Sequence, residues 1–152
     1  MLKMLRCIST ICCVIGLTIG VSGCQTLNDV IQAKQSGAEG TAVEYSLSEG
    51  QAWDIAKTVL RWEGVDAIEE HRDEGYMLTS TGFSIGTVGT VIGVWVERGS
   101  KPGLVRVVVV TKRRVVTNII TSLTESTFQL SFAQAAEIVK SGKPLPRVRP
   151  AS

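Results

Sequence analysis

The sequence predicts an α+β fold: a single domain with a curled antiparallel sheet of four to five strands and two helices packed on one face. Apolar residues alternate with period two in several segments, recur at helical spacing in two others, and are separated by glycine-containing turns. The length of 152 residues suits one domain, and the composition, 44% apolar and 20% charged, excludes collagen-like, mucin-like and fully disordered chains.

Residues 1–23 have the organisation of a secretory signal. Lys3 and Arg6 give a basic start, and an apolar run of 14 residues follows from Ile8 to Val21. A membrane-crossing helix needs about 20 apolar residues, so this run is too short to span. An uncleaved anchor helix is the alternative interpretation.

The end of this run resembles the lipobox of bacterial lipoproteins, because Val21, Ser22, Gly23 and Cys24 fill its aliphatic, small, Gly-or-Ala and Cys positions. The resemblance implies cleavage before Cys24, diacylglycerol transfer to its thiol and acylation of the freed amine. Gln25, where Asp would retain a lipoprotein in the inner membrane, implies the outer membrane, facing the periplasm.

The other cysteines, Cys7, Cys12 and Cys13, lie within the predicted signal. The mature chain would therefore have neither a free thiol nor a disulfide, which suits an oxidising compartment. This pattern excludes thiol catalysis and cysteine-ligated zinc.

Charge is divided unevenly along the predicted mature chain. Residues 24–96 contain four basic and eleven acidic side chains, and residues 97–152 contain ten basic and three acidic ones. Such asymmetry can mark a surface for an anionic partner, such as lipid headgroups or cell-wall polymer. We favour the alternative, in which the two halves interleave in one domain. Aromatic residues, at 5%, are too sparse for a nucleic-acid stacking surface.

Residues 24–40 are predicted to form the acylated N-terminus and a polar tether, with a short amphipathic turn around Leu27, Val30 and Ile31 on the membrane as a refinement. The domain then occupies residues 41–140. It opens with a half-buried strand over Thr41–Leu47.

A helix is predicted to follow, with the capping box Ser48-Glu-Gly-Gln51 at its start and Gly64 at its end. One apolar stripe runs along it: Ala52, Ile55, Ala56, Val59 and Leu60.

Two hairpins are predicted next. Val65–Arg72 and Gly75–Thr81 flank Asp73-Glu74, and Thr90–Arg98 and Leu104–Lys112 flank a glycine-rich turn. Within the second hairpin, Val107–Val110 has the composition of an interior strand, covered on both faces or on one. The segment Val115–Ile120 would add a further strand.

The last helix is predicted to begin near Ser131, where Ser131-Phe-Ala-Gln134 repeats the capping pattern, and to end at Gly142 and Pro144. Its apolar face comprises Phe132, Ala135, Ala136 and Val139. Residues 141–152, rich in Pro and Arg, are expected to form an extended tail or a strap over the surface, with partial disorder.

The mature domain resembles small uncharacterised bacterial envelope lipoproteins, on the apolar patterns of Val43–Leu47, Ala52–Leu60 and Val91–Val110. At fold level it is also similar to the helix-grip domains of BamC, an accessory lipoprotein of outer-membrane protein assembly. These patterns imply a fold but no activity.

The segment Gly82-Phe-Ser-Ile-Gly86 matches the nucleophile elbow of α/β-hydrolases at Ser84. We interpret the match as incidental, because an elbow joins a parallel strand to a helix and its His comes later, whereas the single histidine, His71, comes earlier. Gly89 and Gly93 extend the glycine-rich stretch without a dinucleotide or Walker motif, which favours bulges, bends or a loop.

His71 lies among Glu69, Glu70, Asp73 and Glu74, which suggests a metal site. Transition-metal sites usually bring several ligands together from separate elements, so we expect a solvated hairpin face and no metal. Glu69 and Glu70 would point to opposite faces of a strand and could not act together as general acid and base.

Trp53, Trp62 and Trp95 are expected in the core; an exposed Trp95 beside Arg106 would instead be an interface hot spot. The basic cluster Lys112–Arg114 is expected on a solvated turn, with anionic lipid contact as the alternative.

The sequence therefore predicts a periplasmic lipoprotein that is not an enzyme and needs no cofactor, bound to membrane lipid through acylated Cys24. It would bind or scaffold an envelope protein complex through the sheet face or the basic half, without nucleic acid. The alternative is a carrier or sensor of an apolar ligand held between helices and sheet. An esterase that uses Ser84 is a third hypothesis.

Overall fold

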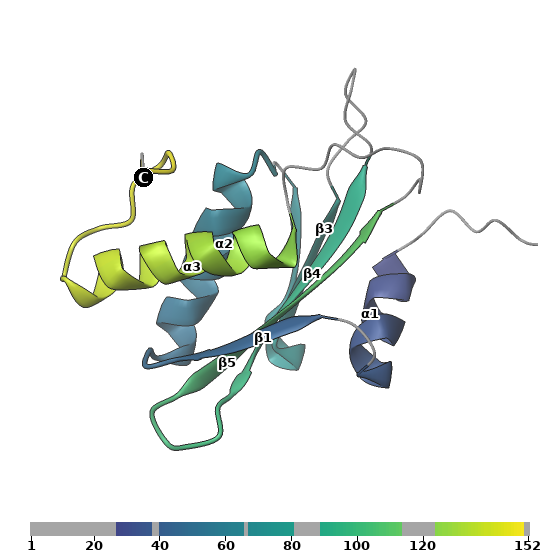
Figure 1. Ribbon diagram of the computed structural model, residues 1–152, viewed down its shortest axis with the longest axis horizontal. Coiled ribbons are helices and arrows are strands. Elements are labelled where there is room, and N and C mark those ends of the chain that lie inside the picture. The colour runs from purple at the N-terminus through teal and green to yellow at the C-terminus, as the bar shows by residue number, and fades with distance from the viewer. Residues whose placement is uncertain (1–26, 38–39, 66, 81–88, 114–123, 151–152) are drawn as a thin grey trace, which may run out of the picture.

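A five-stranded antiparallel sheet lies at the centre of the described chain, with helices on both of its faces (Figure 1). The computed structural model describes residues 27–37, 40–65, 67–80, 89–113 and 124–150. The strand order is β1-β5-β4-β3-β2. In chain order the elements are α1 (Leu27–Ser36), β1 (Thr41–Tyr45), α2 (Glu49–Trp62), β2 (Ile68–His71), η1 (Arg72–Glu74), β3 (Tyr76–Ser80), β4 (Thr90–Arg98), β5 (Val105–Arg113) and α3 (Glu125–Lys140).

Both predicted hairpins are confirmed. β4 pairs with β5 along its whole length, and β2 pairs with β3 across a turn in which Gly75 has a φ of +75°. Glycine adopts this left-handed conformation without steric strain. The run Val107–Val110 is covered on both faces: Val107 and Val109 belong to the core cluster with α2 and α3, Val108 and Val110 belong to the cluster with α1, and each of these valines is at most 4% exposed. The predicted strand Val115–Ile120 lies outside the described residues.

The predicted limits of α2 are confirmed. The Gln51 backbone N–H donates to the Ser48 hydroxyl (3.2 Å), and the Ser48 backbone N–H donates to the Gln51 side chain (2.9 Å). At the other end Gly64 has a φ of +80°, and the next backbone N–H, of Val65, donates to the Leu60 carbonyl. This is the hydrogen-bond pattern of a glycine-terminated helix. All five residues of the predicted apolar stripe are buried.

The predicted start of the last helix at Ser131 is wrong. α3 begins at Glu125, and its capping box uses Thr124 and Thr127. Ser131 lies inside the helix, fully buried, and its hydroxyl donates to the Thr127 carbonyl (3.0 Å). The apolar face extends back by one turn to Phe128, which is also fully buried, so tertiary packing favours the earlier start. The predicted end is confirmed, with Gly142 at a φ of +73°.

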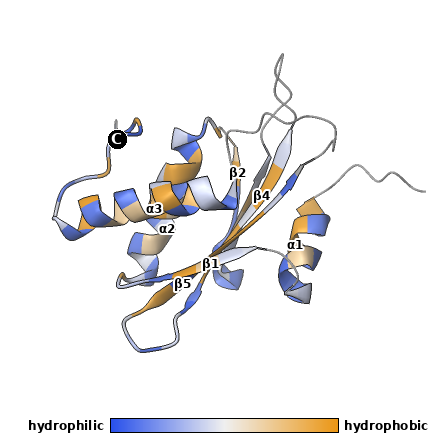
Figure 2. Cartoon of the chain, in the orientation of Figure 1, coloured by the Kyte–Doolittle hydropathy of each residue, from blue (hydrophilic) through white to orange (hydrophobic). Residues whose placement is uncertain are grey.

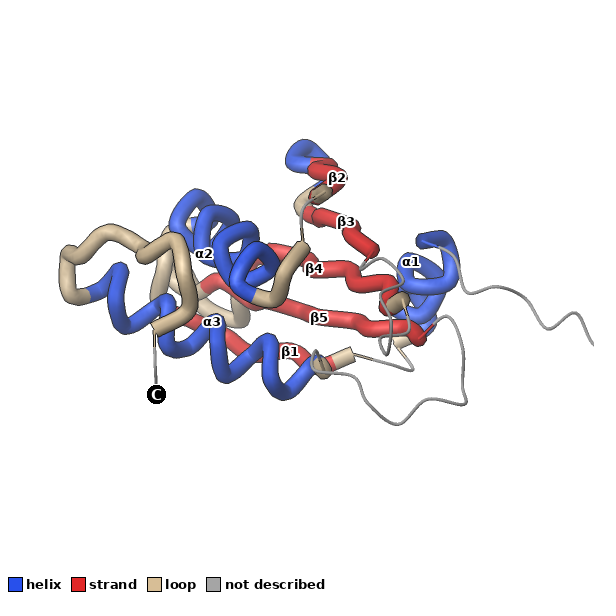
Figure 3. Tube along the Cα trace, turned by 90° about the horizontal axis from the view of Figure 1, so that it is seen from above, coloured by secondary structure: helices blue, strands red, loops and turns tan. Residues whose placement is uncertain are grey.

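Part of the predicted tether is a helix. α1 packs on the face of the sheet opposite α2 and α3 (Figure 3), and its Val30 is fully buried. The amphipathic turn predicted here is therefore present, but its apolar side covers the sheet. Gly93 of β4 permits this contact, because a Cβ at that position would lie 2.6 Å from Val30 Cγ1. The sheet thus carries two helices on one face, as predicted, and a third on the other.

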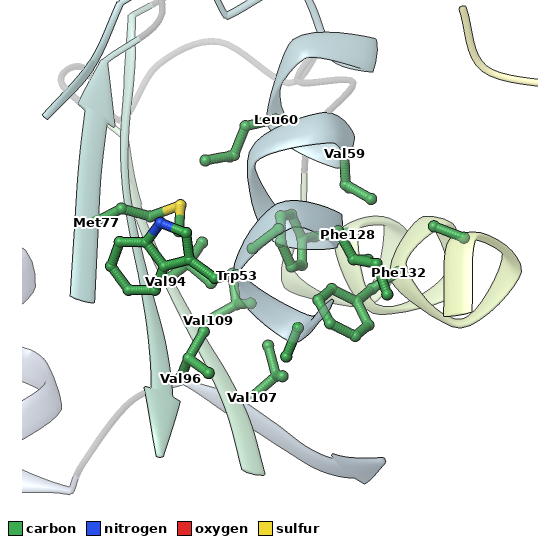
Figure 4. Close-up of a cluster of buried hydrophobic side chains, with 14 of the residues drawn as sticks. Trp53, Val59, Leu60, Met77, Val94, Val96, Val107, Val109, Phe128 and Phe132 are labelled. Carbon is green, nitrogen blue, oxygen red and sulfur yellow. The ribbon is translucent and has the colours of Figure 1, made fainter. Parts of the chain in front are cut away.

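The larger core lies between the sheet and the helices α2 and α3. Figure 4 shows side chains from both helices meeting valines of β4 and β5, and Figure 2 shows these central strands as hydrophobic. The largest side chains in this layer are Trp53, Phe128 and Phe132, each at most 2% exposed. Burial on this scale is the main favourable term in folding.

Polar contacts fix α3 against the edge strand β1. The Tyr45 hydroxyl donates to Gln129 Oε1 (2.9 Å), and Gln129 Nε2 donates to the carbonyls of Val107 (3.1 Å) and Thr41 (3.2 Å). Burial raises the pKa of Tyr45 to about 12. The amide of Gln129 is thereby hydrogen-bonded in a buried position, as such a group requires.

The C-terminal segment is a strap, one of the two predicted forms. Residues 143–150, which we call the strap, return from α3 to the end of α2 (Figure 1). Leu145 packs against the core. Arg149 pairs with Glu63, and Lys34 pairs with Glu97, so ion pairs join the acidic and basic halves of the chain. The favoured interpretation of the charge asymmetry, interleaving within one domain, agrees with these pairs.

Candidate functional site

The face of the sheet beside α1 carries a row of three stacked rings. Cross-strand pairing aligns His71, Tyr76 and Trp95 on β2, β3 and β4. The His71 and Tyr76 rings stack with centroids 4.5 Å apart, and the Tyr76 and Trp95 rings with centroids 5.9 Å apart. Trp95 is 8% exposed beneath α1, whereas Tyr76 and His71 are half-buried. Trp95 is therefore the buried end of the row, and Tyr76 and His71 are partly accessible to solvent.

Charged side chains continue this face toward the β4–β5 turn. Lys34, in the last turn of α1, donates to Glu97 (2.7 Å) and lies over the Trp95 ring, 5.8 Å from its centroid. Arg106 is 3.9 Å from the same carboxylate, and cross-strand pairing places it beside Glu44 of β1. Acidic and basic groups thus alternate across β4, β5 and β1.

Glu44 is held at the end of this charged row by the β4–β5 turn. It accepts from the Ser100 backbone N–H (2.6 Å) and the Ser100 hydroxyl (2.7 Å). These hydrogen bonds lower the pKa of Glu44, with Arg106 and Lys101 adding a smaller electrostatic effect. We call His71, Tyr76, Glu97, Arg106 and Glu44 the α1 rim: the polar and aromatic part of this face that α1 leaves accessible.

The acidic cluster around His71 is divided between the two faces, as the strand alternation predicts. His71 Nε2 lies 2.7 Å from Glu69 and its Nδ1 lies 3.8 Å from Glu74. Glu70 points the other way, where Trp53 Nε1 donates to it (2.9 Å) and Lys57 pairs with it. In the described part of the chain, no three His, Cys, Asp or Glu side chains are grouped to hold a metal ion.

The predicted core positions of the tryptophans are confirmed for Trp53 and Trp95, and Trp62 is half-buried at the end of α2. The alternative of an exposed Trp95 is wrong, because α1 covers the ring. Arg106 itself is exposed.

The expected basic turn at Lys112–Arg114 is wrong for its first two residues. Lys112 and Arg113 belong to β5, opposite Val91 and Thr90, because the β4–β5 ladder continues to the first residue of β4. Arg114 lies outside the described residues.

Several predicted positions fall outside the described ranges: the lipobox Val21–Cys24, and Gly82, Ser84 and Gly86 of the hydrolase-like motif. Gly89 directly precedes β4, and Gly93 lies within it, opposite Leu78. None of the helices that the structure describes combines the length and apolar character needed to span a bilayer.

Sequence reasoning missed two groups of residues that the structure brings together. The α1 rim is assembled from five strands, and only the pairing register, which depends on the whole sheet, aligns its members. The contacts of Trp62 and Glu63 with the strap join positions more than 80 residues apart.

No protein-family model and no curated protein matches this chain.

Proposed function

We propose that this chain is a lipoprotein of the bacterial cell envelope, anchored through acylated Cys24 and facing the periplasm, more specifically from the outer membrane. It acts as a non-catalytic component that binds or scaffolds an envelope protein complex. One observation carries the proposal furthest: α1 begins at Leu27, three positions after Cys24, and is packed into the domain. The lipobox pattern therefore adjoins a folded element.

This spacing would hold the domain close to the membrane. Three residues extend by at most about 11 Å, whereas the 24–40 tether expected from the sequence has a span on the order of 20 Å. Because α1 is fixed to the sheet through Val30 and Gly93, an acyl anchor at Cys24 would restrain the whole domain. A short connection of this kind favours a component that presents a defined surface to a neighbour.

The α1 rim is the surface that we assign to the envelope partner. Its half-buried rings offer stacking area, and the Glu97 and Arg106 side chains offer charge-assisted hydrogen bonds. The layer in which an apolar-ligand carrier would hold its ligand contains Trp53, Phe128 and Phe132, packed against one another and the sheet. Binding at the surface is therefore the better supported of the two functions.

A mass spectrum of the native N-terminus tests the anchor. We expect the chain to begin at Cys24 with a diacylglyceryl thioether and an acylated amine, and we expect Cys24→Ser to retain residues 1–23 without acylation. A full-length, unmodified native chain would contradict the proposal.

Crosslinking in intact cells followed by pull-down tests the surface. We expect reproducible envelope partners that Arg106→Glu removes, because it places a third carboxylate beside Glu44 and Glu97. Lys140→Glu, an equivalent charge reversal at the exposed end of α3, is the matched control and should leave recovery unchanged. Equal recovery with both variants would exclude the α1 rim as the docking surface.

A further inference from the structure

The end of α2 holds two polar groups that both find partners in the strap. Trp62 Nε1 donates to the Pro146 carbonyl (3.0 Å), and Arg149 Nη1 donates to Glu63 Oε1 (3.3 Å). Trp62 and Glu63 are the last residue of α2 and its C-cap. Two consecutive residues thus recognise a carbonyl and a guanidinium three residues apart, while Leu145 packs against the core.

With the strap in place, the Glu63 side chain is largely removed from water. Its side chain is only 9% exposed, whereas that of Arg149 is 44% exposed. A carboxylate that is largely removed from water needs a cation or hydrogen-bond donors beside it. The Ser131 hydroxyl of α3 lies 3.4 Å from Glu63 Oε1, but its single proton is donated to the nearer Thr127 carbonyl (3.0 Å). Arg149 of the strap is therefore the charged donor that faces the Glu63 carboxylate.

The strap itself is held at few points. Lys143, Pro144, Arg147 and Val148 are exposed, with Val148 at 77%. Prolines at 144, 146 and 150 fix φ and favour an extended chain, so little conformational entropy is lost when such a segment docks. Proline-rich segments are commonly recognised on aromatic surfaces. Here the Trp62 indole N–H donates to the Pro146 carbonyl, and Glu63 accepts from Arg149, which follows a bend at Arg147 and Val148.

We propose that Trp62 and Glu63 form a recognition site for proline- and arginine-containing segments of partner proteins, and that the strap occupies this site as an internal ligand. The strap of a second copy is the less favourable occupant, since the chain's own strap is present at a much higher effective concentration. A partner segment competes by offering further contacts beyond those of the strap. Both contacts of this site lie within the described residues, and neither depends on lipid anchoring.

The test uses the full chain and a synthetic peptide of residues 141–152 as the probe. Arg149→Glu places a carboxylate opposite Glu63 and should release the strap without changing the site. We expect this variant to bind the peptide at least about tenfold more tightly than the unaltered chain does, the size expected for a charge-assisted hydrogen bond. Calorimetry gives the affinity, and the NMR signal of the Trp62 indole N–H reports the location.

Arg147→Glu is the matched control, because it makes the same charge change on an exposed strap residue that lies two positions away. It should bind the peptide as weakly as the unaltered chain. A peptide that keeps only Leu145, Arg149 and the prolines, with alanine elsewhere, should bind the Arg149→Glu chain within about threefold of the full peptide. A peptide carrying Glu in place of Arg149 should not bind.

Three outcomes would overturn the proposal. The first is a folded Arg149→Glu chain without saturable binding or a Trp62 response, and the second is an Arg147→Glu chain that binds equally well. The third is an unaltered chain that sediments as a dimer and becomes monomeric on Arg149→Glu, because the ligand would then be the strap of a second copy. If Arg149→Glu does not fold, Arg149→Gln removes the cation with the same expectations.

Discussion

At the scale of single residues, the absence of a Cβ at Gly93 allows α1 to pack against β4. Gly93 is buried in the middle of β4, and a Cβ there would lie 2.5 Å from the Trp95 ring and 2.6 Å from Val30. The ring of Trp95 therefore folds over the glycine, and α1 rests on both. A sequence pattern shows that such a glycine weakens a strand, but it does not show which element approaches it.

Gly93→Ala should destabilise the fold by about 1–3 kcal/mol, because the added methyl group would clash with both the Trp95 ring and the Val30 side chain in a packed interior. Urea unfolding measures the change. Gly50→Ala is the control: it lies in the first turn of α2 with open space around it, and alanine there should be neutral or stabilising by up to about 1 kcal/mol. Equal stability of the two variants would contradict the packing described for α1.

The Glu70 carboxyl should make the stability of the domain depend on pH. The Lys57 ammonium and, secondarily, the Trp53 indole N–H donate to it and lower its pKa. A lowered folded-state pKa contributes stability above the unfolded-state pKa, and this contribution is lost as the pH falls through the folded-state value. Lys57→Met should therefore raise the pKa of Glu70, measured by NMR titration of the carboxyl carbon.

Lys57→Met should also reduce stability near neutral pH and have a smaller effect in acid, where protonated Glu70 no longer pairs with Lys57. Lys143→Met, a change at an exposed strap residue, is the control and should leave the Glu70 titration unchanged. An unchanged Glu70 pKa in Lys57→Met would exclude the ion pair as its cause.

At the scale of elements, sequence reasoning succeeded where local chemistry determines the structure. The capping box at Ser48, the glycine at 64 and the two hairpin turns each act within a few residues, and all are confirmed. It failed where packing between distant elements decides. α1 has a polar composition, and its few apolar residues become a core only when the second face of the sheet covers them.

Because α3 begins at Glu125 and not at Ser131, substitutions at Thr124 and at Ser131 should differ in their effect on the free energy of unfolding. Thr124→Ala removes the hydroxyl that accepts from the Thr127 N–H (3.2 Å) and should destabilise the fold by about 1 kcal/mol. Ser131→Ala should have a smaller effect, since the higher helix propensity of alanine offsets the lost bond to the Thr127 carbonyl. Urea unfolding compares the two, and the reverse order would indicate a helix that begins at Ser131.

At the scale of the whole molecule, the two ends of the sheet differ in their distance from the proposed anchor. α1 runs in the same direction as β4, because Val30 packs against Gly93 and Lys34, one turn later in α1, pairs with Glu97, four residues later in β4. The N-terminal end of α1 therefore lies near the start of β4, and the β4–β5 turn lies at the other end (Figure 1). An acyl anchor at Cys24 would bring the first of these ends toward the bilayer.

Fluorophores at the two ends test this orientation in the lipid-anchored chain. The chain would be purified from membranes, reconstituted in vesicles and labelled at Asn28→Cys in α1 or at Lys101→Cys in the β4–β5 turn, both exposed positions. The two labels are otherwise matched, because residues 25–152 contain no other cysteine. A lipid-borne quencher should quench the Asn28→Cys label more strongly, since at most about 11 Å of chain separates α1 from the anchor. Equal quenching would mean that the domain turns freely, and stronger quenching at Lys101→Cys would reverse the orientation; either result contradicts a short restraint through α1.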